Sequence, residues 1–261
     1  MISSLLVFLA ILSAASLSDA GAGVPHQIHH LRPRSGSGGQ RILGVSCLSW
    51  RLGVETNNIR DWKLVPEVCE GYVGNYMLGH QYRKDCNAVA YAAVQYAKSI
   101  KPAGDGKDIW VFDIDETSLS NLPYFARSDV AFGAKAYNAT AINEWVMEGK
   151  APAVPGVILL YKQLVKLGYK VVFLTGRTEN QRQITTQNLN NVGYHSWENL
   201  ILKQTSESGK TAVAYKSGRR KELEESGYRI VGNVGDQWSD LLGSHSGNRT
   251  FKVPDPLYYI S

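Results

Sequence analysis

The chain has 261 residues, a length that suits one domain with extensions or one large and one small domain. Its hydrophobic content of 44% and charged content of 20% are typical of a globular protein with a sizeable core. The net charge of +5 is only mildly basic, and no motif typical of RNA or DNA binding accompanies it, so we exclude nucleic acid as a partner. The longest basic run, Arg219-Arg220-Lys221, is expected on a solvated helix face, with a basic rim that attracts anionic substrates as the alternative.

Residues 1–20 are typical of a secretory signal peptide. The apolar run from Leu5 to Ala15 is too short to span a bilayer, and Ser18-Asp19-Ala20 provides small residues for cleavage after Ala20. The segment before this run lacks Lys and Arg, which departs from the usual pattern. No later apolar run is long enough for a membrane helix, so we expect no membrane association. The signal predicts the secretory pathway and does not distinguish an extracellular from a vacuolar destination.

Residues 21–45 form a polar leader rich in Gly, Ser, Pro and His, for which we expect no packed structure. Residues 46–104 are expected to form a helical extension, with loop and short elements over 46–61 and helices over 65–77 and 85–100. In a secreted chain, three cysteines suggest one disulfide and one remaining thiol. We expect the pair Cys47–Cys69, because Cys86 lies in the more strongly helical segment; the state of Cys86 stays open.

Two glycosylation sequons agree with secretion. They are Asn138-Ala139-Thr140 and Asn248-Arg249-Thr250.

From residue 105 to residue 261 strands and helices alternate. Buried strands are expected over 109–112, 169–174, 200–202 and 228–234, with helices over 154–167, 179–191 and 214–226 between them. A last edge strand is expected over 251–253. This β-α-β-α-β-α-β order predicts an α/β fold, a three-layer parallel sheet with right-handed crossovers. The segment 121–149 is an insertion, long enough to cover the carboxyl edge of the sheet and shape a substrate pocket.

Reactive side chains follow three of these strands. Asp113 and Asp115 follow the first strand, Thr175 the second, and Asp236 and Asp240 the last of the alternating series. The carboxyl ends of parallel strands meet at one edge of a sheet, so we expect these side chains to converge, together with Lys216 near the start of a helix. Carboxylates, a hydroxyl and a lysine supply what phosphoryl transfer needs: oxygen ligands for Mg²⁺, donors to phosphate oxygens, and a nucleophile.

Taken singly, each of these residues has an ordinary structural explanation. Thr175-Gly176 fits a plain strand-to-turn transition, Lys216 a solvated helix position, and Asp240 a helix cap. Arg177 could touch the substrate or pair with a carboxylate. Their common position at strand ends favours the functional interpretation.

Four motifs in this order resemble those of the haloacid dehalogenase (HAD) superfamily of phosphatases. They are Asp113-x-Asp115-x-Thr117, Thr175-Gly176-Arg177, Lys216 and Gly235-Asp236-x-x-x-Asp240. The N-terminal third is similar to plant acid phosphatases and vegetative storage proteins of the class B type. That similarity rests on Cys47-Leu48-Ser49-Trp50-Arg51, Glu55-x-Asn57-Asn58, Val65-Pro66-x-x-Cys69 and Tyr76-Met77.

The resemblance implies a role for each motif residue. Asp113 would be the nucleophile that forms an aspartyl-phosphate, and Asp115 the acid and base for the leaving group and the water. Thr175, Gly176, Arg177 and Lys216 would bind the phosphoryl group. The Mg²⁺ ligands would be Asp113, Asp236, Asp240 and Asp115, the last through its backbone carbonyl.

The resemblance leaves two functions open. One is a secreted, Mg²⁺-dependent acid phosphatase acting on small phosphomonoesters; the other is a vegetative (nitrogen) storage glycoprotein with weak or incidental activity. Retention of Asp113 favours catalysis, because the resemblance implies that storage members can lack this aspartate. The sequence does not identify the physiological substrate or the oligomeric state, although an amphipathic helical extension is compatible with a homodimer.

Overall fold

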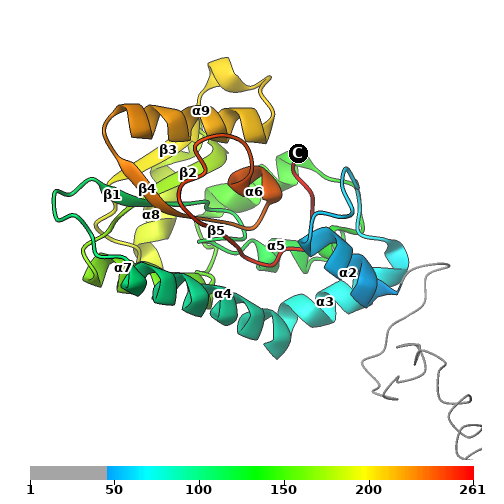
Figure 1. Ribbon diagram of the computed structural model, residues 1–261. Coiled ribbons are helices and arrows are strands. Elements are labelled where there is room, and N and C mark those ends of the chain that lie inside the picture. The colour runs from blue at the N-terminus through cyan, green and yellow to red at the C-terminus, as the bar shows by residue number, and fades with distance from the viewer. Residues whose placement is uncertain (1–45) are drawn as a thin grey trace, which may run out of the picture. The chain divides into compact units, whose positions relative to one another are not determined.

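A sheet of five parallel strands lies at the centre of the molecule, in the order β3-β2-β1-β4-β5 (Figure 1). The computed structural model describes residues 46–261, so the predicted signal peptide (1–20) and leader (21–45) lie outside the described residues. The strands are β1 (Asp108–Phe112), β2 (Lys170–Thr178), β3 (Asn199–Lys203), β4 (Arg229–Gly235) and β5 (Thr250–Lys252). The predicted parallel α/β sheet is confirmed, including the edge strand.

The central strand β1 is buried on both faces because its apolar residues alternate between two cores. Trp110 and Phe112 belong to the larger core, whereas Ile109 and Val111 face the smaller one. Successive side chains of a strand point to opposite faces, so a continuous apolar run is what a doubly covered strand requires.

Helices cover both faces of the sheet and make three layers. On the face of the larger core lie α4 (His80–Ser99), α7 (Pro155–Lys166) and α8 (Arg182–Asn191), with α4 packed along α7. On the other face, α9 (Ala212–Glu225) supplies Tyr215 and Leu223 to the smaller core. Figure 1 shows α4 and α7 on one side of the strands and α9 on the opposite side. The sides of α7, α8 and α9 follow from right-handed crossovers: β1 to β2 and β2 to β3 run in one direction across the sheet, and β3 to β4 runs back.

The N-terminal part contains more helix than we expected. Residues 47–55, predicted as loop with short elements, form a continuous helix, α2 (Cys47–Glu55), and Ser46 caps it by accepting a hydrogen bond from the Ser49 N–H. It is followed by η2 (Glu67–Cys69) and α3 (Glu70–Leu78). Cys47 and Cys69 form a disulfide, and Cys86 is a buried free thiol.

The insertion between β1 and α7 is attached to this N-terminal part. It contains α5 (Leu122–Phe125), η3 (Ala131–Gly133) and α6 (Ala139–Glu148). Ala131, Phe132 and Gly133 all have positive φ. The backbone turn they make brings the Phe132 ring against Gly74, where a Cβ would collide with it, and lets the Gly133 carbonyl accept a hydrogen bond from the Val65 N–H (3.0 Å).

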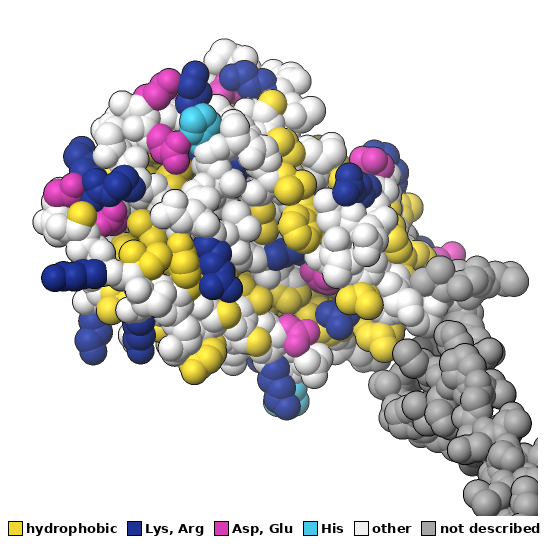
Figure 2. Space-filling model, in the orientation of Figure 1, with side chains coloured by type: hydrophobic (Ala, Val, Ile, Leu, Met, Phe, Trp, Pro, Cys, Tyr) yellow, Lys and Arg dark blue, Asp and Glu magenta, His cyan; other side chains and the backbone are white. Residues whose placement is uncertain are grey.

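The remaining elements lie near the strand ends. They are the short helices η4 (Glu179–Gln181), η5 (Thr205–Glu207) and α10 (Trp238–Leu241). None of the helices within residues 46–261 has both the length and the apolar character needed to cross a bilayer. On the face shown in Figure 2, hydrophobic side chains reach the surface in several separate groups between charged ones.

Candidate active site

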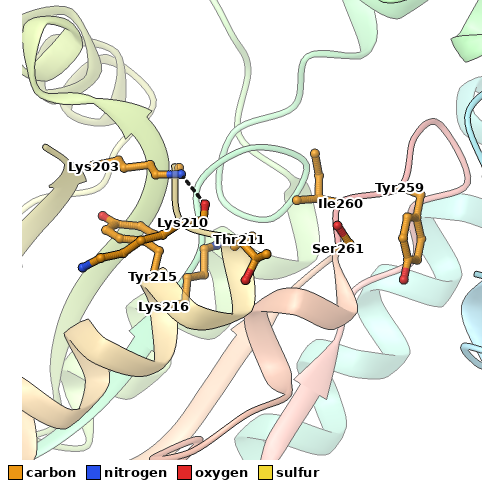
Figure 3. A pocket seen from close by; sticks show the side chains of 10 residues that line it. Lys203, Lys210, Thr211, Tyr215, Lys216, Tyr259, Ile260 and Ser261 are labelled. Atoms are coloured by element: carbon orange, nitrogen blue, oxygen red, sulfur yellow. Dashed lines mark hydrogen bonds between the residues drawn. The ribbon is translucent and has the colours of Figure 1, made fainter. Parts of the chain in front are cut away.

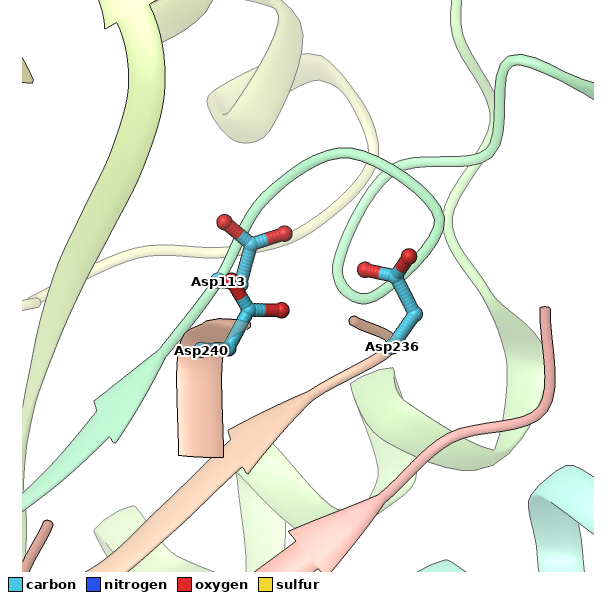
Figure 4. Close-up of side chains that lie close together, drawn as sticks. All are labelled: Asp113, Asp236 and Asp240. Atoms are coloured by element: carbon cyan, nitrogen blue, oxygen red, sulfur yellow. The ribbon is translucent and has the colours of Figure 1, made fainter. Parts of the chain in front are cut away.

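The predicted acidic residues meet at the carboxyl edge of the sheet. Asp113 directly follows β1, and its N–H donates to the Val234 carbonyl of β4 (2.9 Å), which holds the two strand ends together. Oxygen atoms of Asp113, Asp236 and Asp240 lie within 4.8 Å of one another (Figure 4), and all three residues are buried. They lie at the point where the strand order reverses, the usual position of ligands in open parallel sheets.

Lys216 lies between two of these carboxylates. Its Nζ is 2.5 Å from Asp113 Oδ1 and also pairs with Asp240 Oδ1, and all three side chains are buried. Burial would lower the pKa of Lys216, but its two acidic partners outweigh that effect and hold the pKa above the ordinary value. The solvated-helix interpretation of Lys216 is therefore wrong for the structure.

Asp236 and Asp240 differ in their partners. Asp236 accepts hydrogen bonds from Thr117 Oγ1 (2.8 Å) and Gln237 Nε2 (2.9 Å), and pairs with no basic side chain of residues 46–261. Asp240 Oδ2 accepts from the Gln237 N–H (3.0 Å), so this residue caps α10 as well as pairing with Lys216. Asp240 therefore acts as a helix cap, the structural explanation, and also lies in the acidic cluster.

Burial raises the pKa of Asp113 and of Asp236 well above the usual range, and acidic neighbours raise both further. A divalent cation would remove the cost of this charge accumulation. The cluster offers only carboxylate oxygens, the donors that Mg²⁺ prefers, so the residues present fit the implied metal.

Asp115 does not belong to this cluster through its side chain. Arg177 holds its carboxylate, with Nη2 2.8 Å from Oδ1 and Nε 3.1 Å from both oxygens. Asn121 Nδ2 donates to Asp115 Oδ1 as well (2.8 Å). Burial would raise the pKa of Asp115, but Arg177 and Asn121 outweigh it and the pKa is lowered. Arg177, for which substrate contact and carboxylate pairing were both open, pairs with a carboxylate in the structure.

The Thr175-Gly176-Arg177 motif lies inside β2 and not after it. We predicted a strand that ends at Leu174, but pairing with β3 resumes at Thr178 after an irregularity in register. Thr175 is fully buried, and its Oγ1 accepts a hydrogen bond from the Arg177 N–H (3.0 Å). Gly176 is exposed and lines the cavity beside Asp113.

Two further buried acids, which we did not predict from the sequence, adjoin the site. Glu116 is fully buried at φ 55°, and it accepts hydrogen bonds from Asn121 Nδ2 (3.0 Å) and the Tyr258 hydroxyl (3.0 Å). Asp255 accepts from Gln237 Nε2 (2.7 Å). Burial raises the pKa of both acids. Glu116 lies within the first motif, between Asp115 and Thr117, and that position could have pointed to it. Asp255 is not part of any of the four motifs.

A cavity of about 710 Å³ opens above Asp113. A smaller one of about 420 Å³ adjoins it, and Figure 3 shows the residues that line this smaller cavity. The two share five lining residues: Gly176, Ala212, Lys216, Tyr259 and Ile260. In the smaller cavity Lys203 Nζ donates to the Lys210 carbonyl (3.0 Å). A volume of several hundred Å³ is typical of small-molecule sites.

Comparison with known proteins shows which families and proteins this chain is similar to. The model of the HAD superfamily, subfamily IIIB (acid phosphatase), matches residues 34–261. Acid phosphatase 1 of Solanum lycopersicum is 49% identical over 216 residues, which cover 83% of this chain and 84% of that protein. Vegetative storage protein 1 of Arabidopsis thaliana is 37% identical over 268 residues, covering 98% of each.

Among solved structures, the class C acid phosphatase from Bacillus anthracis has a TM-score of 0.60 at 21% identity, covering 73% of this chain and 85% of that chain. At this level of identity, the similarity shows a shared fold.

Proposed function

This chain belongs to subfamily IIIB, the acid phosphatases, of the HAD superfamily, and from that membership we propose that it is a Mg²⁺-dependent acid phosphatase that hydrolyses small phosphomonoesters through an aspartyl-phosphate. The observation that carries the proposal is the buried contact of Asp113 with Lys216 beside Asp236 and Asp240. A carboxylate held next to a cation and a metal-binding acid cluster is equipped to attack phosphorus.

In the first step, Asp113 attacks phosphorus, the bond from phosphorus to the leaving oxygen breaks, and Asp115 gives that oxygen a proton. In the second, water attacks phosphorus, Asp115 takes the water's proton, and the bond between phosphorus and Asp113 breaks to release phosphate. Lys216 would balance charge on Asp113 and on the phosphoryl oxygens. Thr175 Oγ1 accepts the Arg177 N–H and donates to no group within residues 46–261, so its hydroxyl proton is available to a phosphoryl oxygen.

The ion pair between Asp115 and Arg177 orients the proton donor and keeps it ionised in the free enzyme. A phosphoryl dianion beside Asp113 would compete for Arg177 and raise the pKa of Asp115, which supplies the proton-donating form when substrate is bound. Arg177 thereby links substrate binding to the protonation of Asp115.

Asp113, Asp236 and Asp240, with the backbone carbonyl of Asp115, would hold Mg²⁺, which supplies positive charge against the carboxylates and the phosphate. Without such charge, the acid cluster would repel a phosphoryl dianion. This repulsion is the physical argument for metal dependence.

We extend the proposal to location and modification. Relatives carry the names Stem 28 kDa glycoprotein, from Glycine max, and Vegetative storage protein 1, which agrees with a secreted or vacuolar glycoprotein. Asn138 and Asn248 are both exposed and accessible to glycosylation. The Asn138 Oδ1 caps α6, and a glycan on Nδ2 leaves that oxygen free. Storage is the second candidate function, favoured by the relatives' names alone.

The test is hydrolysis of p-nitrophenyl phosphate between pH 4 and pH 8, with Mg²⁺ and with EDTA. The wild-type protein should hydrolyse p-nitrophenyl phosphate only with Mg²⁺. Asp113→Asn should fold but be inactive, and Asp236→Asn should lose Mg²⁺ affinity and activity together. Asp129→Asn, an exposed acid of the insertion, is the matched control and should stay active. Full activity in EDTA, or an active Asp113→Asn variant, would contradict the proposal; an inactive, folded wild type would favour storage.

A further inference from the structure

The cavity above Asp113 has a charged base and a largely apolar wall. The base carries Asp113, Asp115 and Lys216. The wall comes from the insertion, from the loop between α2 and η2, and from the C-terminal segment; its principal apolar residues are Trp62, Leu64, Tyr137, Ile142, Val146 and Tyr259. Three segments far apart in sequence therefore build one apolar surface beside the reactive carboxylates.

The residues of the wall pack against one another and against helices α2 and α6. Trp62 packs against Tyr259 (ring centroids 6.3 Å) and against Trp50 of α2 (5.2 Å), so two wall segments hold each other. Val146 is buried on α6 and Ile142 is half-buried one turn earlier on the same helix. A preformed apolar surface of this kind binds an apolar group without first having to be ordered.

Asp115 is connected to this wall by a chain of hydrogen bonds. Asn121 Nδ2 donates to Asp115 Oδ1 (2.8 Å), and Asn121 Oδ1 accepts from Trp145 Nε1 of α6 (2.9 Å). The proton donor thus lies on the side of the cavity that α6 forms. Because a leaving oxygen must lie beside its proton donor, the organic part attached to that oxygen extends toward the apolar wall.

The cations at the base of the cavity are already paired, so none of them is free to bind a second phosphate on the leaving group. Among the described residues that line it, Lys216 and Arg177 are already paired with site carboxylates, and Lys63 and Lys135 are exposed at its rim. In the adjoining cavity Lys210 pairs with Glu207 (3.2 Å), and Lys203 donates to a backbone carbonyl.

We propose that this wall is a leaving-group subsite that selects phosphomonoesters of apolar alcohols, aryl or unbranched alkyl, over those of strongly polar alcohols. The inference rests on the proposed phosphatase function and specifies its substrate class. Aromatic and aliphatic side chains that are preformed beside the proton donor bind such a group by burying its carbon surface.

The test uses n-alkyl phosphates from ethyl to hexyl, because their leaving groups have nearly the same basicity and differ in apolar length. Each added methylene that reaches the wall should raise kcat/KM by up to about fourfold, as full burial of one methylene allows. Over the series, wild type should gain at least about tenfold.

Variants test whether the wall residues cause the rise of kcat/KM with chain length. Ile142→Ala should reduce the hexyl-to-ethyl ratio of kcat/KM, and Tyr137→Ser should do the same if the first variant folds poorly. Leu159→Ala, an exposed aliphatic position on α7, is the matched control and should keep the wild-type ratio. A flat or falling series in wild type, or an equal ratio in Ile142→Ala, would overturn the inference.

Binding of n-alkylphosphonates, measured by calorimetry with Mg²⁺, separates this inference from the proposed function. These compounds cannot be hydrolysed, so their affinity reports the subsite even if no phosphate ester is turned over. If affinity rises with chain length in a protein that hydrolyses no phosphate ester, the proposed phosphatase function is refuted and the subsite is supported. Affinity independent of length in an active enzyme would refute the subsite alone.

Discussion

The substitution Lys216→Met should lower the free energy of unfolding by about 3–5 kcal/mol, because it leaves two buried carboxylates without their shared cation. Removing one partner of a buried ion pair costs this much, since the remaining charge is neither solvated nor paired. A domain is usually stable by about 5–15 kcal/mol, so the loss is a large share of the total. Urea unfolding in EDTA, followed by tryptophan fluorescence, measures it.

Mg²⁺ should restore part of this loss, because a cation on the acid cluster replaces the missing positive charge. A ligand at one hundred times its dissociation constant stabilises the folded state by about 2.7 kcal/mol. Adding Asp240→Asn to Lys216→Met should also recover stability, since it removes one of the two unpaired charges. If the single variant does not fold, the double variant supplies the measurement.

Lys221→Met is the control on the same helix. Its side chain is 57% exposed and pairs with the exposed Glu225, so the change should cost about 0.5 kcal/mol or less. If Lys216→Met cost less than about 1 kcal/mol in EDTA, the cation would not be needed to hold the two carboxylates together, and our account of the site would be refuted.

Three further results are expected. Arg177→Met should slow alkyl phosphates at least about tenfold more than p-nitrophenyl phosphate, because poor leaving groups depend on an oriented Asp115; equal losses would contradict this. Gly235→Ala should destabilise the protein and weaken Mg²⁺ binding, because the added Cβ would collide with the Asp240 side chain of α10. Gly218→Ala is the control: its Cβ would meet open space on α9, so urea unfolding should show no change or a stabilisation of up to about 1 kcal/mol. Burial raises the pKa of Cys86 to about 12, so the native thiol should resist iodoacetamide at pH 8 and react at that pH after unfolding; rapid native labelling would contradict its burial.

The sequence predicted the sheet and the position of its reactive edge because both depend on local patterns. The apolar run that ends at Phe112 is followed at once by Asp113, and the run that ends at Val234 is followed by Gly235 and Asp236. Buried strands need such runs, and charged residues stop them. Convergence at one edge then follows from parallel topology alone.

The partners of the site residues could not be predicted in the same way. The contact of Lys216 with Asp113 joins positions 103 residues apart, and that of Tyr258 with Glu116 joins positions 142 apart. Hydrophobic periodicity predicts which face of a helix or strand is buried, but it does not predict which polar groups of other elements that face will contact. The helix Cys47–Glu55 was missed for a related reason: its apolar pattern is weak, and tertiary packing stabilises it.

Asn121 has a consequence for how this family could diversify. Its side-chain amide contacts Asp115 on one side and Trp145 on the other, so the residue is shared by the machinery of proton transfer and the surface that would select substrates. The insertion therefore cannot change its substrate-binding surface without also affecting proton transfer. Replacing residues 122–149 with those of a relative would change the catalytic rate together with the substrate selectivity, unless the contact between Asn121 and Trp145 were kept. Substitutions in α6 would therefore be limited by their effect on proton transfer.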